Sequence, residues 1–351
     1  MILDFSVGDD DQNNGLIKQV LVIGFVVLLV CYAAVKLALR PYSSNEHSFT
    51  RTNQTKSRQE RKLYSPPAGY FLNKDHLYLF TQTWLPLKST TNPKAVIVLV
   101  HGVGEHCGRY EALARQLCDK LGVAVVALDH QGHGKSEGDR LFVRDFDDFV
   151  DDVEALTKQT QAKFPGVPCV ILGHSMGGLI AIRTVQKYPK LFVSAIFSAP
   201  ALGVSASKTM LKYAPLLAER VPHLPTQRLD PNLLCRDPCV VDLYCNDPLC
   251  SKQGVTARLG YEILGAIEKA LAWAREVEVP YLIVRGSEDK ITLKPEIEQF
   301  QQATSSNDNT FVELKGLYHE IFNEKGEQAL NLVVDWITKR LAMMPSTSSM
   351  V

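Results

Sequence analysis

The stretch that decides the fold runs from Pro168 to Arg183 and reads PCVILGHSMGGLIAIR. A short apolar run leads into the motif G-x-S-x-G, with Ser175 at its centre, and a pattern typical of a helix follows. A strand–turn–helix segment of this kind holds the serine in a strained backbone conformation, so that its hydroxyl projects from the sheet edge. Gly173 and Gly177 leave room for the turn, because a Cβ atom at either position would crowd it. The segment therefore predicts that Ser175 is a nucleophile.

Apolar runs on both sides of this segment predict the sheet around it. Short continuous runs, as expected for strands buried on both faces, occur at 95–100, 123–128, 170–172, 192–197, 281–284 and 311–314. A further strand is expected at 77–84, and helical patterns occupy 109–121, 145–164, 176–188, 295–303 and 324–341. This alternation predicts an α/β fold: a mostly parallel central sheet with helices on both faces.

One interval, residues 200–279, interrupts the alternation because it contains no clear strand. We interpret it as a helical cap inserted between two strands of the sheet. Residues 210–217 within it are strongly apolar, and two interpretations stay open. The segment is either a helix packed on the core or an apolar lid that faces a lipid.

A serine nucleophile needs a base, which is oriented in turn by an acid. In this fold the three follow in the order serine, acid, histidine. Asp289 lies in the loop after the strand predicted at 281–284 and is the expected acid, with Glu288 as the alternative. His319 lies in the loop after the next strand and is the single histidine downstream of that acid. The predicted catalytic set is therefore Ser175, Asp289 and His319.

The loop that follows the run at 95–100 reads HGVGEHCG, from position 101 to 108. Its place predicts one of the two backbone donors of an oxyanion hole, and we assign the donors to the N–H groups of Val103 and Met176. The glycines of this loop miss the spacing of a dinucleotide-binding loop by one residue. The turn containing His130 and His133 suits a tight strand–helix connection better than a metal site, so no metal and no organic cofactor is expected.

The amino-terminal part of the chain has a different pattern. An acidic segment, 1–19, precedes an apolar stretch, 20–39, which is long enough for a transmembrane helix, and a polar linker follows at 40–65. A cleaved signal peptide is the alternative, although the acidic segment argues against it. Basic residues gather after the stretch, which predicts a single-pass membrane protein whose catalytic domain, 66–342, faces the cytoplasm. Residues 343–351 form a tail.

Charge and cysteine content exclude some classes of protein. The chain has 38 basic and 38 acidic residues, so a nucleic-acid partner is not expected. Four of the eight cysteines gather at positions 235, 239, 245 and 250, without the spacing of a zinc ribbon. Free thiols are expected for a cytosolic domain, with a disulfide or a metal site as alternatives.

Several motifs in order give the chain a resemblance to a known family. They are H-G-x-G-E-H-x-G-R-Y at 101–110, D-x-x-G-H-G-x-S at 129–136, G-H-S-M-G-G at 173–178, DLYCNDPL at 242–249, G-S-x-D at 286–289 and Y-H at 318–319. Over roughly residues 66–342 the chain resembles the monoacylglycerol lipase group of α/β hydrolases, also described as serine-aminopeptidase-like or lysophospholipase-like hydrolases.

The resemblance implies the α/β-hydrolase fold and hydrolysis of monoacylglycerols through an acyl-enzyme, with the same three catalytic residues. It also implies that Glu105, Arg109 and Tyr244 meet the glycerol end of the substrate. Alternatively, Glu105 and Arg109 pair with each other or cap the following helix. The chain departs from the family at Phe322, where related lipases can carry a second histidine.

These observations predict a membrane-anchored serine ester hydrolase that acts on monoacylglycerols or similar neutral lipid esters. Its expected partners are a lipid ester substrate and a membrane. The alternatives are a lysophospholipase, a carboxylesterase for small esters and, from another class, a non-catalytic binding module that retains the fold.

Overall fold

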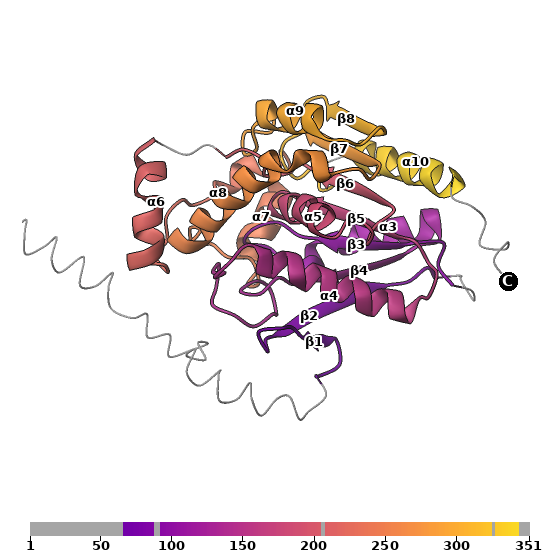
Figure 1. The fold of residues 1–351 in the computed structure, drawn as a ribbon, viewed down its shortest axis with the longest axis horizontal. Helices are drawn as coiled ribbons and strands as arrows, with labels where there is room; N and C mark the ends of the chain where they lie inside the picture. Colours follow the sequence, from indigo (N-terminus) through magenta and orange to yellow (C-terminus); the bar gives the residue numbers. More distant parts are fainter. Residues whose placement is uncertain (1–65, 88–91, 205–207, 325–326, 344–351) are drawn as a thin grey trace, which may run out of the picture. The chain divides into compact units, whose positions relative to one another are not determined.

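The computed structural model describes residues 66–87, 92–204, 208–324 and 327–343. These residues contain an eight-stranded sheet in the order β1-β2-β4-β3-β5-β6-β7-β8 (Figure 1). β1 and β2 pair antiparallel with their neighbours, and the pairs from β4 to β8 are parallel. The strands are β1 Tyr70–Leu72, β2 Tyr78–Trp84, β3 Val96–Val100, β4 Ala124–Leu128, β5 Cys169–His174, β6 Ser194–Ser198, β7 Tyr281–Gly286 and β8 Asn309–Leu314. The predicted α/β-hydrolase fold is confirmed. The strand β1 was not predicted from the sequence.

Helices cover both faces of the sheet, which explains the continuous apolar runs. Every residue of β3, β4, β5, β6 and β7 is buried, and alternate side chains enter two separate cores. One core lies under α4 Asp147–Lys163, α5 Met176–Lys187, α8 Ala257–Ala272 and α9 Lys294–Ala303. The other lies under α3 Glu111–Leu121 and α10 Gln328–Met343.

Two predicted helices begin later than expected. The helix expected from 109 starts as a short 3-10 turn, η1 Cys107–Tyr110, before α3. The helix expected from 324 begins at Gln328, and the Glu324 carboxylate accepts hydrogen bonds from the side chain of Arg236 and the backbone of Tyr318. Glu324 thereby ties the loop that carries His319 to the inserted segment.

The interval 200–279 contains both a cap and a helix of the main core. α6 Lys208–Arg220, the 3-10 turn η2 Pro231–Leu233 and α7 Pro238–Asn246 form the cap. α8 packs its apolar face, including Leu259 and Ile263, into the core beside α5, and the 3-10 turn η3 Ala274–Glu276 follows it. The amphipathic pattern of α8 is the same for a helix on the sheet and a helix on a cap, so the sequence did not separate the two.

The apolar stretch at 210–217 lies in α6 and is largely exposed. Leu211, Tyr213 and Leu216 each expose between 45% and 51% of their surface. Ala218 is buried, and α6 packs along α8. A helix that only completed the core would cover these side chains, so α6 exposes apolar side chains to solvent.

The prediction of a single-pass membrane protein needs a correction. Within the part of the chain that the structure describes, no helix has both the length and the apolar composition needed to cross a bilayer. This finding contradicts the predicted localisation, which we withdraw. The predicted anchor at 20–39, its flanking segments 1–19 and 40–65 and the tail after Met343 lie outside the described residues. The seven cysteines that the structure does describe are free thiols.

Candidate active site

Ser175 lies in a tight turn between β5 and α5. Its backbone has φ 56° and ψ −120°, a left-handed conformation that is rare for a residue with a side chain. Hydrogen bonds fix the turn on both sides: the Ser175 N–H donates to the Ser198 carbonyl at 2.9 Å, and the Ser175 carbonyl accepts from the Ala201 N–H at 3.0 Å. The serine therefore stands at the carboxyl edge of the sheet.

The two glycines of the motif are required by close backbone contacts. A Cβ atom on Gly173 would lie 2.2 Å from the Gly177 carbonyl oxygen, and one on Gly177 would lie 2.1 Å from the Val100 carbonyl oxygen. Neither distance is compatible with a side chain, so the turn packs against its own helix and against β3. The structural role predicted for both glycines agrees with this geometry.

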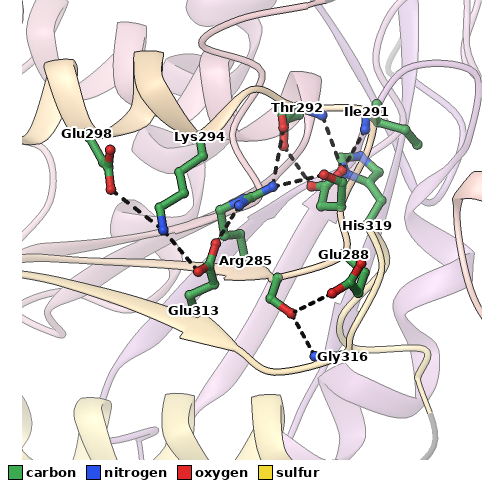
Figure 2. A network of polar contacts seen from close by, with 11 residues as sticks. Arg285, Glu288, Ile291, Thr292, Lys294, Glu298, Glu313, Gly316 and His319 are labelled. Carbon is green, nitrogen blue, oxygen red and sulfur yellow. Dashed lines mark hydrogen bonds and ion pairs between the residues drawn. The ribbon is translucent and has the colours of Figure 1, made fainter.

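Asp289 and His319 form a buried pair at the same edge of the sheet. The Asp289 Oδ2 atom lies 2.9 Å from His319 Nδ1 and also accepts a hydrogen bond from the Thr292 hydroxyl at 2.7 Å. Its Oδ1 atom accepts from the backbone N–H groups of Ile291 and Thr292, two residues that Figure 2 shows beside His319. The carboxylate therefore has partners on both oxygens and fixes the ring of His319.

The surroundings of Asp289 keep it ionised. Burial alone would raise the pKa of its carboxyl group, but His319 and the hydrogen bonds from Thr292 and Ile291 together hold the pKa below its ordinary value. Arg285 donates to the Asp289 carbonyl at 3.0 Å and so stabilises the loop that carries Asp289. The alternative acid, Glu288, is exposed and accepts a hydrogen bond from the Ser287 side chain, outside this pair.

A pocket joins these groups. Its wall is formed by Gly102, Val103, Glu105, Arg109, His174, Ser175, Leu229, Leu234, Tyr244, Ile291, His319 and Glu320. Val103 lines it on the side of the loop that follows β3, and Met176 is the first residue of α5, where backbone N–H groups have no partner within the helix. Both expected oxyanion donors thus lie next to Ser175, and their role stays a prediction.

The three residues expected at the glycerol end lie together in this pocket. Arg109 contacts Glu105 with its Nη1 atom at 2.5 Å, and its guanidinium group lies over the Tyr244 ring, 5.0 Å from the centroid. Glu105 Oε1 also accepts hydrogen bonds from the Gly102 N–H and the Tyr110 hydroxyl, both at 2.6 Å. Burial alone would raise the pKa of Glu105, but Arg109 and neighbouring groups lower it to about 2. The alternative interpretation, that Glu105 and Arg109 pair with each other, therefore describes the geometry correctly.

Among the lining residues that sequence reasoning missed, two have ionisable side chains, Glu320 and His174. Glu320 binds Arg109 through both carboxylate oxygens, at 2.6 and 2.8 Å. The His174 ring lies against His319 with centroids 4.7 Å apart and the ring planes inclined by 49°, and burial lowers the pKa of His174 to about 4. Both residues are direct neighbours of predicted catalytic residues in the chain, and this adjacency was the one signal available.

Two clusters of side chains contain residue types that can bind a metal. His101, His130 and His133 are buried together, but their rings face one another and Phe149, and His101 Nε2 accepts the backbone N–H of His130 at 2.9 Å. Within the described residues, His106, Asp247 and Cys250 bring potential ligand atoms within 4.8 Å of one another.

In the second cluster two of the three groups already satisfy each other. The His106 Nε2 atom lies 2.8 Å from Asp247 Oδ2, a contact that ties the loop after β3 to the end of α7. Burial raises the pKa of Cys250 to about 12, so its thiol stays protonated. The cluster is accounted for as a contact between cap and core.

Three features define the class of protein: the strained turn at Ser175, the chain order serine, aspartate, histidine, and the position of all three at one edge of the sheet. The class is that of serine ester hydrolases with the α/β-hydrolase fold. A model of the family described as serine aminopeptidase, S33, matches residues 91–326. The chain belongs to this family, and it is a monoacylglycerol lipase-like member. This class sets aside the alternative of a non-catalytic binding module.

Individual relatives agree with this assignment. The chain is 35% identical to the monoglyceride lipase of Rattus norvegicus over 78% of this chain and 91% of that protein. It is 33% identical to the monoacylglycerol lipase of Mycolicibacterium smegmatis over 74% of this chain and 92% of that protein. The crystal structure of the Paleococcus ferrophilus monoacylglycerol lipase matches with a TM-score of 0.68 and 31% identity, over 75% of this chain and 99% of that one.

Proposed function

We propose that this chain hydrolyses the ester bond of monoacylglycerols through an acyl-enzyme on Ser175. The observation that carries the proposal is the pairing of His319 with Asp289 at 2.9 Å in the pocket that Ser175 lines. The likeness to lipases of this substrate class, over three quarters of the chain, supports the choice of substrate.

In the proposed mechanism His319 removes the proton of Ser175 while the serine oxygen attacks the ester carbonyl. Asp289 holds the imidazole in one tautomer and stabilises its charged form. The N–H groups of Val103 and Met176 donate to the oxyanion. His319 then protonates the leaving glycerol, and a water molecule repeats the sequence to release the fatty acid.

We further propose that Glu105, Arg109 and Tyr244 form the wall that meets the glycerol. They are polar or amphipathic, they lie in the same pocket as Ser175, and all three are held by mutual contacts. Phe322 has a different role, because it packs against the core under α3 and α10. Glu320, and not Phe322, therefore contributes to the polar end of the pocket.

A lipid substrate also needs a route to this pocket. The pocket has a volume of about 40 Å³, far below the roughly 300–1,000 Å³ of typical ligand sites. We infer that the cap moves to admit the acyl chain, and that the exposed apolar side chains of α6 contact the lipid phase from which the substrate comes.

A panel of esters with the same acyl chain tests the proposed function. We expect higher kcat/KM for 1-oleoylglycerol than for oleoyl lysophosphatidylcholine or for a short soluble ester such as methyl butyrate. The Ser175→Ala variant supplies the background rate for each. Preference for the lysophospholipid would identify a lysophospholipase, and preference for the short ester would identify a carboxylesterase; either result contradicts the proposed substrate.

A further inference from the structure

Glu320 follows the proposed catalytic base directly and is buried, with 5% of its surface exposed. Its two carboxylate oxygens bind Nη1 and Nη2 of Arg109 at 2.6 and 2.8 Å, and Asn323 donates to Oε2 at 2.8 Å. Its backbone N–H donates to the Leu234 carbonyl of the cap at 2.8 Å. Glu320 therefore lies in a fixed position in the pocket wall.

The contacts of Glu320 use the donors with which Arg109 would otherwise bind an anion. A guanidinium group has five N–H donors and binds phosphates and carboxylates in the bidentate geometry that Glu320 occupies. Three hydrogen bonds from Arg109 go to Glu105 and Glu320, and the Tyr244 ring lies against the guanidinium group. The arginine is thus already engaged by carboxylates of its own chain.

The charges of this group do not cancel. Two carboxylates, Glu105 and Glu320, face one guanidinium, which leaves a net charge of −1 in the pocket wall. All three side chains are at most 10% exposed, so solvent screens this charge weakly. An anionic alcohol entering the pocket would meet net repulsion, whereas an uncharged diol would meet oxygens that accept its hydroxyl protons.

We propose that Glu320 is a specificity-determining residue: by occupying Arg109, it makes the pocket accept esters of uncharged alcohols and reject esters whose alcohol carries a phosphate. This inference rests on the proposed function, since it names the head-group class for the same site. In this role Arg109 forms part of the pocket wall and does not bind an anionic group of the substrate.

A substitution that removes the negative charge of Glu320 tests the inference. Glu320→Gln keeps the size of the side chain and frees one side of the guanidinium group. The two substrates are 1-oleoylglycerol and 1-oleoyl lysophosphatidate, which share the acyl chain and differ by the phosphate on the alcohol. We expect the ratio of their kcat/KM values, neutral over anionic, to fall about tenfold or more in Glu320→Gln, mainly because turnover of the anionic ester rises.

Glu324→Gln is the matched control, because Glu324 is also buried and also binds an arginine, but it does not line the pocket. Its ratio should equal that of the wild type. An unchanged ratio in Glu320→Gln, or the same fall in both variants, would overturn the inference. A ratio is used because a general loss of catalysis next to His319 would lower both rates together.

A second measurement separates this inference from the proposed function and needs no variant. Glycerol and glycerol 3-phosphate are compared as protectants of wild-type Ser175 against labelling by a fluorophosphonate. We expect glycerol to protect at the lower concentration, whichever acyl ester the enzyme turns over. Better protection by glycerol 3-phosphate would show that Arg109 still accepts an anion and would overturn the inference, while absence of monoacylglycerol turnover alone would count against the proposed function only.

Discussion

At the scale of single residues, backbone contacts decide where the proposed catalytic side chains lie. Ser175 occupies its strained conformation because Gly173 and Gly177 let the turn approach its own helix and β3. His319 is positioned in a comparable way, since its loop lies directly against Gly286 at the end of β7. The proposed chemistry therefore depends on glycines that touch no substrate.

The contact at Gly286 leads to a test of this dependence. A Cβ atom there would lie 2.1 Å from the Leu317 carbonyl oxygen and 2.2 Å from that of Tyr318. We expect Gly286→Ala to displace the loop of His319, to lower the free energy of unfolding by about 1–3 kcal/mol or more and to reduce ester hydrolysis. Urea denaturation and initial rates measure the two effects.

Gly265→Ala is the matched control for this substitution. Gly265 lies in α8, and a Cβ atom there would meet nothing within 4 Å. We expect this variant to raise the free energy of unfolding by roughly 0.5–1 kcal/mol, because alanine favours a helix. Equal effects of the two substitutions would show that the contact at Gly286 is unimportant.

The role proposed for Asp289 gives a second prediction at this scale. Asp289→Asn keeps the shape of the side chain but removes the charge that stabilises protonated His319. We expect kcat to fall by roughly 10³–10⁴ while fluorescence and circular dichroism report a folded protein. Glu288→Gln, on the exposed neighbour, should keep wild-type kcat. A loss below tenfold in Asp289→Asn would contradict the assignment of the acid.

At the scale of elements, α6 is a part of the cap that has both a proposed role and exposed apolar side chains. Replacing Leu211 and Leu216 with serine removes two side chains that are 45% and 51% exposed. We expect the rate on monoacylglycerol in micelles or vesicles to fall several-fold, because less apolar surface enters the lipid phase. The rate on a short soluble ester should stay at the wild-type value.

Val193→Ser is the control for α6, because Val193 is also apolar and 39% exposed. It directly precedes β6, at the amino end of that strand, whereas Ser175 lies at the carboxyl edge of the sheet. It should leave both rates unchanged. If the α6 variant lost activity equally on soluble and aggregated substrates, α6 would act on folding or catalysis and not on contact with lipid.

Elements differ in how well the sequence predicts them. The core strands were predictable because β3 to β7 are buried on both faces and read as continuous apolar runs. β1 was not, because it has three residues and a mixed burial pattern. The position of α8 depends on tertiary packing, which its amphipathic pattern leaves undecided. Glu320 was missed for a similar reason, since its partner Arg109 lies 211 positions away in the chain.

At the scale of the whole molecule, buried histidines link stability to pH. His101, His130, His133 and His174 are each at most 4% exposed. Burial lowers the pKa of all four, to about 3 for His133 and about 4 for His174. The folded protein thus keeps these rings neutral at a pH where the unfolded chain protonates them.

The sign of this linkage follows from the protons bound. Below pH 6.5 the unfolded chain binds protons at four histidines that the folded protein leaves neutral, so stability falls as the pH drops towards 4. Asp152 acts in the opposite direction, because burial raises its pKa to about 8 and the folded protein binds that proton. Asp148 and Glu262 act in the same direction as Asp152, because burial also raises their pKa. Below about pH 6.5 the four histidines outweigh these carboxyl groups, and each histidine contributes up to about 1.4 kcal/mol per pH unit.

We therefore expect the urea midpoint of unfolding to fall between pH 6.5 and pH 5, before the buried carboxylates of Glu105 and Asp289 become protonated. Asp152→Asn removes one opposing group and should steepen this fall. A midpoint that is constant or rises over this interval would contradict the neutral state of the buried histidines.

Fluorophosphonate labelling, combined with turnover of 1-oleoylglycerol in the wild type and in Ser175→Ala, tests whether Ser175 is the nucleophile. We expect one label per chain, on the peptide that contains Ser175, and loss of both label and turnover in the variant. Turnover that persists in folded Ser175→Ala, or a label on another residue, would contradict the assignment of Ser175 as the nucleophile.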